Sequence, residues 1–241
     1  EGDHKILVFD LGGGTFDVTV VEYTPTQFRV LATDGDVQLG GVDWNDRLLD
    51  YVADAFKQRH GIDPRESPQM IQILRNDCDL AKIELSDKTE TVVHCRYEGR
   101  AIDVPISREL FDSLTADLLQ RTADTTLLVL DEAKVRPDEL EAIVLVGGST
   151  LMPQVPDMIR RILNREPYRG ISPHTAVAEG AAIHAAILEA KFRGDQSELA
   201  ERIRRRLQLV QQENVNSHGL GIVALDPKSG KTVNHIMIPR N

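Results

Sequence analysis

Three consecutive glycines between two short apolar runs constrain the fold of this chain more than any other feature. The run Ile6-Leu7-Val8-Phe9 ends at Asp10, and Gly12-Gly13-Gly14-Thr15 separates it from the alternating run 16–21. This pattern predicts two β-strands joined by a glycine turn. Glycine has no Cβ and tolerates positive φ, so several backbone N–H groups of such a turn can converge on one anion. Asp10 and Asp17 flank the turn, and we expect them to hold a cation.

The chemistry that this turn favours is the binding of a metal-bound phosphate. The turn lacks the Gly-x-x-x-x-Gly-Lys-Ser/Thr pattern, and it does not open a helix after a strand, so it is not one of the better-known phosphate loops. A glycine-rich hairpin turn with two solvated aspartates stays open as the alternative.

Composition narrows the classes of function. The 241 residues are 41% hydrophobic and 27% charged, and a net charge of −10 with a pI near 5.2 argues against a general nucleic-acid or anionic-membrane binder. No apolar run reaches the ~20 residues of a membrane helix. Cys78 and Cys95 lack metal-ligand spacing, which indicates apolar fillers and a reducing, cytoplasmic compartment. No signal peptide is visible, and since Glu1 is not an initiator methionine, we expect the natural N-terminus to lie upstream.

The first half of the chain predicts a small sheet followed by an inserted block. Apolar residues recur at helical spacing from Trp44 to His60. Two helices and two strands after the first three strands indicate an insertion in the sheet domain. The predicted elements are an antiparallel meander of strands over 5–11, 16–23 and 27–33, helices over 44–60 and 68–85, and strands over 89–96 and 100–106.

The second half predicts helices around one buried strand. Ser107 caps an apolar pattern over 110–130 that fits one long helix or two consecutive helices. The strand at 142–146 ends in a glycine pair, and the next helix begins at Pro153. Many alanines and glycines in the helix 174–192 predict close backbone packing. Together these elements predict an α/β fold with ligand at the carboxyl ends of the strands.

The amino-acid composition of the sequence changes after Gly194. Its apolar stripe Leu199, Ile203, Leu207 and Val210 predicts an amphipathic connector helix over 198–212. The i,i+4 charge pairs on this helix are Glu198/Arg202 and Glu201/Arg205. Two strands are predicted after it, over 219–226 and 231–238.

The octapeptide Asp10-Leu-Gly-Gly-Gly-Thr-Phe-Asp17 resembles the second phosphate segment of the actin-like ATPases, in particular the heat-shock 70-kDa chaperone family. Further segments follow that family's order over residues 1 to about 190. The resemblance implies lobe II of an actin-like (ribonuclease-H-like) ATPase domain with an inserted α+β subdomain, a helical connector and a partial β hairpin. The implied parts are a lobe II core at 1–42 and 105–194, an inserted subdomain at 43–104, a connector at 195–214 and the start of a substrate-binding β-domain at 215–241.

The same resemblance implies roles for the turn. Gly12, Gly13 and Gly14 would cradle phosphate, Asp10 and Asp17 would organise metal-bound water, and Thr15 would lie near the attacking water, which makes Asp10, Thr15 and Asp17 the catalytic candidates. The cofactors implied are ATP or ADP with Mg²⁺, and K⁺ is a further candidate ion.

Three other segments would face the nucleoside. Gly40-Gly41 resembles the family's second glycine pair, and Gly147-Gly148-Ser149 resembles its adenosine motif. Asp79, Lys82 and Ser86 lie at i, i+3 and i+7 on one helix face, which suits a ribose diol and a base edge. An exposed i,i+3 ion pair is the alternative for that face.

Three residues depart from the family pattern at the base. Ile83 and Leu151 stand where the family places arginines on either side of adenine, and His174 stands where an aspartate is usual. A cation–π contact contributes about 0.5–2 kcal/mol, so losing both weakens adenine binding roughly ten- to a thousandfold. We expect phosphate binding to be retained and adenine binding to be altered.

The function implied is that of a fragment of a divergent chaperone whose parent hydrolyses ATP to drive binding and release of client peptides. Catalytic groups of the family's other lobe are not encoded here, so we expect the fragment to be inactive as an ATPase. The implied partners are that lobe I, client peptides and co-chaperones, with self-association through the C-terminal strands or the connector helix as a further expectation. Two rivals stay open: another actin-like kinase or filament protein, and a docking module with a vestigial pocket.

Overall fold

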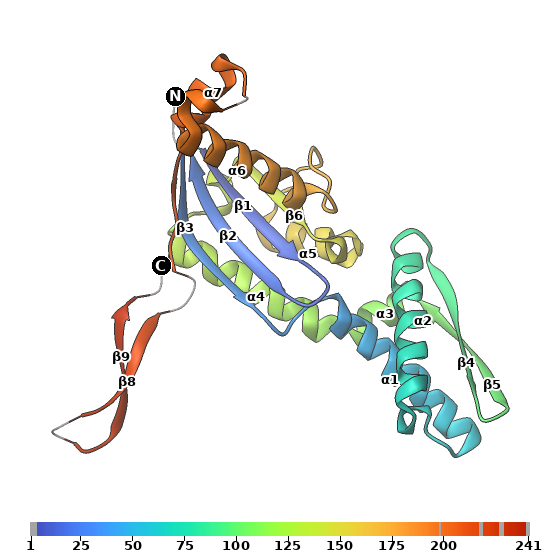
Figure 1. Ribbon diagram of the computed structural model, residues 1–241. Helices are drawn as coiled ribbons and strands as arrows, with labels where there is room; N and C mark the ends of the chain where they lie inside the picture. Colours follow the sequence, from blue (N-terminus) through green and yellow to red (C-terminus); the bar gives the residue numbers. More distant parts are fainter. Residues whose placement is uncertain (1–3, 198, 217–218, 227–228, 240–241) are drawn as a thin grey trace.

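The computed structural model describes residues 4–197, 199–216, 219–226 and 229–239, and its centre is a five-stranded sheet in the order β6-β1-β2-β3-β7 (Figure 1). β1, β2 and β3 are antiparallel neighbours, which confirms the predicted meander, and β6 runs parallel to β1. The strands are β1 (His4–Leu11), β2 (Phe16–Tyr23), β3 (Gln27–Asp36), β6 (Ala142–Val146) and β7 (Gln211–Glu213).

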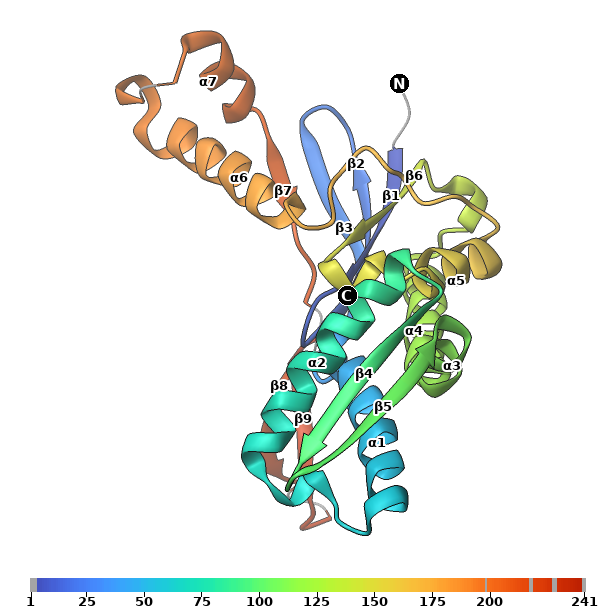
Figure 2. The ribbon, with the colours of Figure 1, turned by 90° about the vertical axis from the view of Figure 1, so that its right-hand side faces the viewer.

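Helices lie on both faces of this sheet. α4 (Ala116–Ala133) and α5 (Gln154–Leu163) cover one face, and α6 (Ala176–Arg193) crosses the other (Figures 1 and 2). The short helix α3 (Arg108–Leu114) precedes α4, so the apolar pattern over 110–130 forms two consecutive helices. Between the sheet and α4 and α5 lies a dry core, which includes Leu7, Phe9, Phe16, Val18, Val129, Val155 and Ile159.

The predicted insertion forms the block that Figure 1 shows beyond the end of the sheet. It contains α1 (Gly41–His60), the short η1 turn (Pro64–Glu66), α2 (Pro68–Asp87), β4 (Glu90–Tyr97) and β5 (Arg100–Ser107). α1 begins three residues earlier than predicted, because Asp43 accepts a hydrogen bond from the Gly40 amide at 2.7 Å and so stabilises its first turn. Both cysteines are buried in this block, and burial raises the pKa of Cys78 to about 12 and of Cys95 to about 11. Their burial agrees with the predicted filler role.

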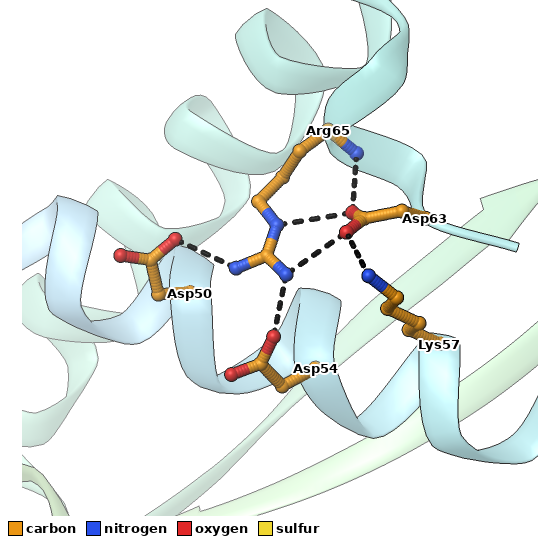
Figure 3. Close-up of polar contacts among 5 residues, drawn as sticks. All are labelled: Asp50, Asp54, Lys57, Asp63 and Arg65. Atoms are coloured by element: carbon orange, nitrogen blue, oxygen red, sulfur yellow. Dashed lines mark hydrogen bonds and ion pairs between the residues drawn. The ribbon is translucent and has the colours of Figure 1, made fainter.

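An arginine ties α1 to the turn that follows it (Figure 3). The Arg65 guanidinium donates to Asp50 and Asp54 on α1 and binds both carboxylate oxygens of Asp63 at 3.0 Å. Lys57 lies 3.2 Å from Asp63 as well. Chiefly because of the Arg65 hydrogen bonds, the pKa of the Asp63 carboxyl lies well below its usual range. This cluster fixes the outer end of the insertion.

The prediction of close backbone packing along α6 is wrong. Only Ala190 of this helix is buried, and Gly180 has no other atom within 4 Å of where a Cβ would stand. The side chains of the sheet and of α6 leave an open groove of about 610 Å³ between them, so the small residues do not meet a backbone. The groove is lined from the sheet by Ile6, Val21, Phe28 and Val30 and from α6 by Val177, Ile183 and Ile187.

The connector differs from its prediction too. Helix α7 covers only Glu201–Gln208, and residues 211–213 form β7, which extends the sheet parallel to β3. The Gln211 amide donates to the Thr26 carbonyl at 2.7 Å, so backbone pairing with the β3 edge replaces the last helical turn. The Glu201/Arg205 pair is present, whereas Glu198 lies outside the described residues.

The last described elements form a hairpin apart from the sheet. β8 (Leu220–Leu225) pairs with β9 (Thr232–Ile238), as predicted, and Figure 1 shows the hairpin extending away from the body of the molecule. Residues 227–228 of its predicted turn and 240–241 lie outside the described part.

Within the described residues, no helix combines the length and the apolar character that crossing a membrane requires.

Candidate functional site

The glycine turn joins β1 to β2 as predicted. Its ends are paired, Leu11 opposite Phe16, and the Gly12 amide closes the turn on the Thr15 carbonyl at 3.0 Å. None of the three turn glycines has a φ in the left-handed region, so the expected use of positive φ is wrong. Gly13 and Gly14 instead have open space where a Cβ would stand, and both are exposed. Glycine therefore keeps the outside of the turn clear of side chains.

The turn is held in place through its carbonyls. The Gly41 amide and the Ser149 hydroxyl both donate to the Gly12 carbonyl at 2.9 Å, and the Val42 amide donates to the Gly13 carbonyl at 2.8 Å. Within the described part of the chain, no acceptor is hydrogen-bonded to the amides of Gly13 and Gly14. Two adjacent N–H groups on a fixed turn are suited to a phosphate oxygen.

Asp10 and Asp17 occupy opposite positions in the β1–β2 ladder. Burial raises the pKa of the Asp10 carboxyl, and the charge of Asp17 raises it further. A divalent cation would offset both the burial of the Asp10 carboxylate and its repulsion by Asp17. Mg²⁺ commonly keeps several waters while it binds one or two carboxylates. Among the described residues, no group of three or more His, Cys, Asp or Glu side chains could hold a metal alone. These two carboxylates therefore fit a cation that is held through water and a bound phosphate.

Gly35 is a site residue that the sequence analysis missed. It pairs with Asp17 across β2 and β3, and a Cβ on it would stand 2.7 Å from an Asp17 carboxylate oxygen and 2.3 Å from the Phe16 carbonyl oxygen. Glycine at this position leaves room for the carboxylate. Only the strand register, which the sequence does not give, reveals it.

The second glycine pair packs against the turn. A Cβ on Gly40 would stand 2.4 Å from the Gly14 nitrogen, and one on Gly41 would stand 2.4 Å from the Ser149 hydroxyl oxygen. Glycine at position 40 thus allows close approach of two backbones, whereas glycine at position 41 leaves room for the Ser149 and Lys82 side chains. Among the glycines of the predicted site segments, Gly147 is the one with a positive φ, +87°. A Cβ on it would stand 2.3 Å from the Leu11 carbonyl oxygen. The predicted glycine segments therefore meet at one place, as expected.

The predicted helix face on α2 reaches the second glycine pair. Lys82 is buried, and its Nζ lies 2.9 Å from Asp79 and donates to the Gly41 carbonyl at 3.1 Å. The Lys82 hydrogen bond lowers the pKa of Asp79, and a hydrogen bond from Asn45 adds to this effect. The Lys82 end of this ion pair is therefore buried against the second glycine pair, while the Asp79 side chain stays 47% exposed.

A cavity of about 430 Å³ opens between α2 and the glycine segments. Ile83 and Leu151 both line it and are 56% and 46% exposed, and the His174 ring lies 3.3 Å from where a Cβ on Gly148 would stand. All three departures from the family pattern thus line this cavity. The remaining lining residues are Gly13, Asp79, Lys82, Ser86, Asp87, Gly148, Ser149 and Met152.

Not every predicted residue lines the cavity. The predicted residues that belong to the turn and its supports, which adjoin the cavity at Gly13, are Asp10, Gly12, Gly14, Thr15, Asp17, Gly40, Gly41 and Gly147. The Ser149 hydroxyl, predicted to reach a base, donates to the Gly12 carbonyl. Asp87 and Met152 line the cavity without having been singled out from the sequence. Asn45, which stands where the family usually has an acid, contacts Asp79, and the sequence analysis did not predict that contact.

Known proteins resemble this chain along most of its length. The sequence model of the family described as "Hsp70 protein" matches residues 1–208. The chaperone protein DnaK of Thermosipho africanus is 44% identical over 192 residues, which is 77% of this chain and 32% of that protein. The DnaK proteins of Thermosipho melanesiensis and Thermotoga petrophila are 42% and 44% identical over the same shares. The chain therefore spans about a third of the length of these relatives.

Proposed function

Because the chain belongs to the Hsp70 family, we propose that it is the nucleotide-binding part of a chaperone that binds and hydrolyses ATP to drive client-peptide binding and release. Family membership favours this function over that of an actin-like kinase or filament protein. The observation that carries the proposal is the glycine turn, whose free Gly13 and Gly14 amides adjoin the 430 Å³ cavity.

The phosphates would bind at the turn. The Gly13 and Gly14 amides donate to phosphate oxygens, and Asp10 and Asp17 hold Mg²⁺ through water, with K⁺ as a further ion at these carboxylates. When bound, Mg²⁺ supplies positive charge that stabilises the phosphates during phosphoryl transfer to water. Thr15, which is exposed at the end of the turn, would orient the attacking water.

The nucleoside would occupy the cavity beside the turn. Asp79, Lys82 and Ser86, which line the cavity, would face its sugar and the edge of its base. Gly148 and Ser149 line the cavity as well, and Gly41, whose carbonyl accepts a hydrogen bond from Lys82, would complete the nucleoside side of the site. Ile83 and Leu151 offer aliphatic contact where a cation–π contact would bind more tightly. We therefore expect the base subsite to bind adenine more weakly than a site with the two arginines would.

A second candidate function is a docking module whose pocket no longer binds nucleotide. The exposed Ile83 and Leu151 side chains in the cavity favour it, because an unused pocket is free to lose its cationic groups. An empty pocket at saturating nucleotide would support this candidate.

The proposed partners follow from the family. A complementary ATPase lobe, client peptides and co-chaperones would bind the whole protein, in the cytoplasm. The domain parts proposed are those predicted from the sequence, with the core at 1–42 and 105–194 and the insertion at 43–104.

The exposed β8–β9 hairpin would also pair with a second copy, since open strand edges recruit strands. Light scattering on a chain that ends at Gly194 tests this, because removing the hairpin and connector should abolish any dimer.

Calorimetric titration with Mg-ADP tests the proposed function. We expect saturable binding to the wild type, stronger for Mg-ADP than for Mg-GDP, and loss of binding in the Asp79→Ala/Lys82→Ala double variant. Because contacts to the γ-phosphate come from the complementary lobe in this family, the chain alone should not turn over ATP. Turnover that disappears with Asp10→Asn would contradict that expectation.

A further inference from the structure

A buried asparagine on α1 breaks the pattern of its helix face. Asn45 lies between Gly41 and Leu48 on the face that α1 buries, and it is 4% exposed. The other large residues of that face are apolar, among them Leu49 and Val52. A polar side chain at such a position needs a partner, because an unpartnered buried amide is costly.

The partner of Asn45 is a cavity residue. Its Nδ2 donates to Asp79 Oδ1 at 2.9 Å, across 34 residues of sequence. Within the described residues, Asn45 Oδ1 is buried and accepts no hydrogen bond. Exchanging the amide oxygen and nitrogen would set an oxygen against the carboxylate, so the orientation is fixed by Asp79 alone.

Asp79 Oδ1 accepts two hydrogen bonds, and this decides which oxygen a ligand can use. Lys82 Nζ lies 2.9 Å from the same Oδ1. No donor from the described part of the chain is hydrogen-bonded to Oδ2, and the Asp79 side chain is 47% exposed in the lining of the cavity. Two donors on one oxygen hold the carboxylate in one rotamer and leave Oδ2 for a ligand hydroxyl.

We propose that Asn45 is a positioning residue, which orients the Asp79 carboxylate toward the sugar hydroxyls of a bound nucleoside diphosphate. The proposal rests on the proposed function for its ligand. Lys82 alone does not fix Asp79, because the Lys82 ammonium also donates to the Gly41 carbonyl at 3.1 Å. Lys82 and Asp79 moreover lie on the same helix, α2, so their contact does not fix the carboxylate relative to α1. Asn45 adds a contact from a second helix, so the carboxylate is fixed relative to α1 and the second glycine pair.

The test compares two ligands and several variants. Mg-ADP and Mg-2′,3′-dideoxy-ADP are titrated into the wild type, Asn45→Ala, Asn45→Leu, Asp79→Ala and the Asn45→Ala/Asp79→Ala pair. Leucine has the same branched arrangement of side-chain heavy atoms as asparagine but no hydrogen-bonding group, so Asn45→Leu separates packing from the hydrogen bond. Asn76→Ala removes an exposed asparagine on α2 and is the matched control.

We expect both Asn45 variants to weaken Mg-ADP binding about 5- to 10-fold, which corresponds to the loss of one hydrogen bond of average net strength. The dideoxy ligand should bind these variants as it binds the wild type, and the double variant should bind Mg-ADP no more weakly than Asp79→Ala. Equal weakening of both ligands, or additive losses in the double variant, would assign Asn45 a packing role only.

A second readout does not depend on nucleotide. The carboxyl pKa of Asp79, followed by ¹³C NMR, should rise in both Asn45 variants, because one of the two donors that lower it is gone while Lys82, the stronger one, remains. An unchanged pKa would overturn the positioning role, whatever the nucleotide does. A wild type that binds neither ligand would instead overturn the proposed function, and with it the sugar as the group that Asp79 contacts.

Discussion

Asp10 and Asp17 face each other across the β1–β2 ladder, two residues from the glycine turn on either side. Each strand contributes one carboxylate, and the turn amides lie next to both. This relationship follows from antiparallel pairing alone, since any residues at these two positions would be opposite each other. It is the reason that an eight-residue segment can bring a phosphate and its cation together.

Replacing Asp10 should stabilise the ligand-free protein. Folding raises the pKa of this carboxyl, so the native state binds the proton more tightly than the unfolded chain does. Its contribution to stability therefore falls as the pH rises above about 4, the unfolded value. We expect Asp10→Asn to increase the free energy of unfolding at pH 7, by no more than about 1 kcal/mol since the carboxylate is partly solvated. Urea unfolding of both proteins between pH 3 and pH 8 measures this, and a gain that is independent of pH would contradict it.

Adding a methyl group at the second glycine pair should disturb the turn. The Cβ of Gly40→Ala would stand 2.4 Å from the Gly14 nitrogen, so backbone must move, at a cost of about 1–3 kcal/mol. Mg-ADP binding should weaken as well. Gly180→Ala is the matched control, because the new methyl on α6 meets nothing and should stabilise the helix by roughly 0.5–1 kcal/mol. Denaturant unfolding distinguishes the two, and equal effects would show that the close approach at Gly40 is unimportant.

The Arg65 cluster should contribute to the stability of the insertion without affecting the ligand site. Arg65→Ala removes hydrogen bonds to Asp50, Asp54 and Asp63 and should cost about 1–3 kcal/mol. Arg65→Lys keeps the charge but not the forked geometry, so it should recover only part of the loss.

The pH dependence of this cluster has the opposite sign to that of Asp10. The pKa of Asp63 is lowered on folding, so its contribution is present above about 4 and is lost as the pH falls toward the folded value. Unfolding experiments at pH 7 and pH 2.5 should therefore show a smaller effect of Arg65→Ala at the lower pH. An effect of equal size at both would exclude the ion pairs as its cause.

Restoring arginines at the base subsite should strengthen nucleotide binding. Ile83→Arg and Leu151→Arg place guanidinium groups in the lining of the cavity, and each cation–π contact adds about 0.5–2 kcal/mol. The double variant should bind Mg-ADP at least about tenfold more tightly. Mg-pyrophosphate is the control ligand, because it has no base. An equal gain for both ligands would indicate general charge attraction and not stacking.

The sequence predicted the turn and the strands around it, because glycine, alternation and the Asp10-to-Asp17 segment are local signals. It did not predict β7, because the polar residues 211–213 become a strand only through backbone pairing with β3. The α6 groove was also missed, because small residues permit close packing but do not require it.

Contacts between distant residues account for the other misses. Asn45 bonds Asp79 across two helices, and Gly35 faces Asp17 only in the observed register. Neither relationship leaves a local pattern in the sequence. The predicted site residues came instead from the glycine turn and from the resemblance of short segments to the heat-shock 70-kDa family, both of which are local signals.

The amide resonances of Gly13 and Gly14 test the central claim most directly. If the turn holds the phosphates of a nucleotide in the adjoining cavity, titration with Mg-ADP should shift both ¹H–¹⁵N signals saturably, with the same dissociation constant as resonances of Asp79 and Lys82. Mg²⁺ alone should not reproduce the shifts. Saturation of the cavity resonances while the Gly13 and Gly14 signals stay in place would contradict the account, because a ligand would then occupy the cavity without its phosphates on the turn.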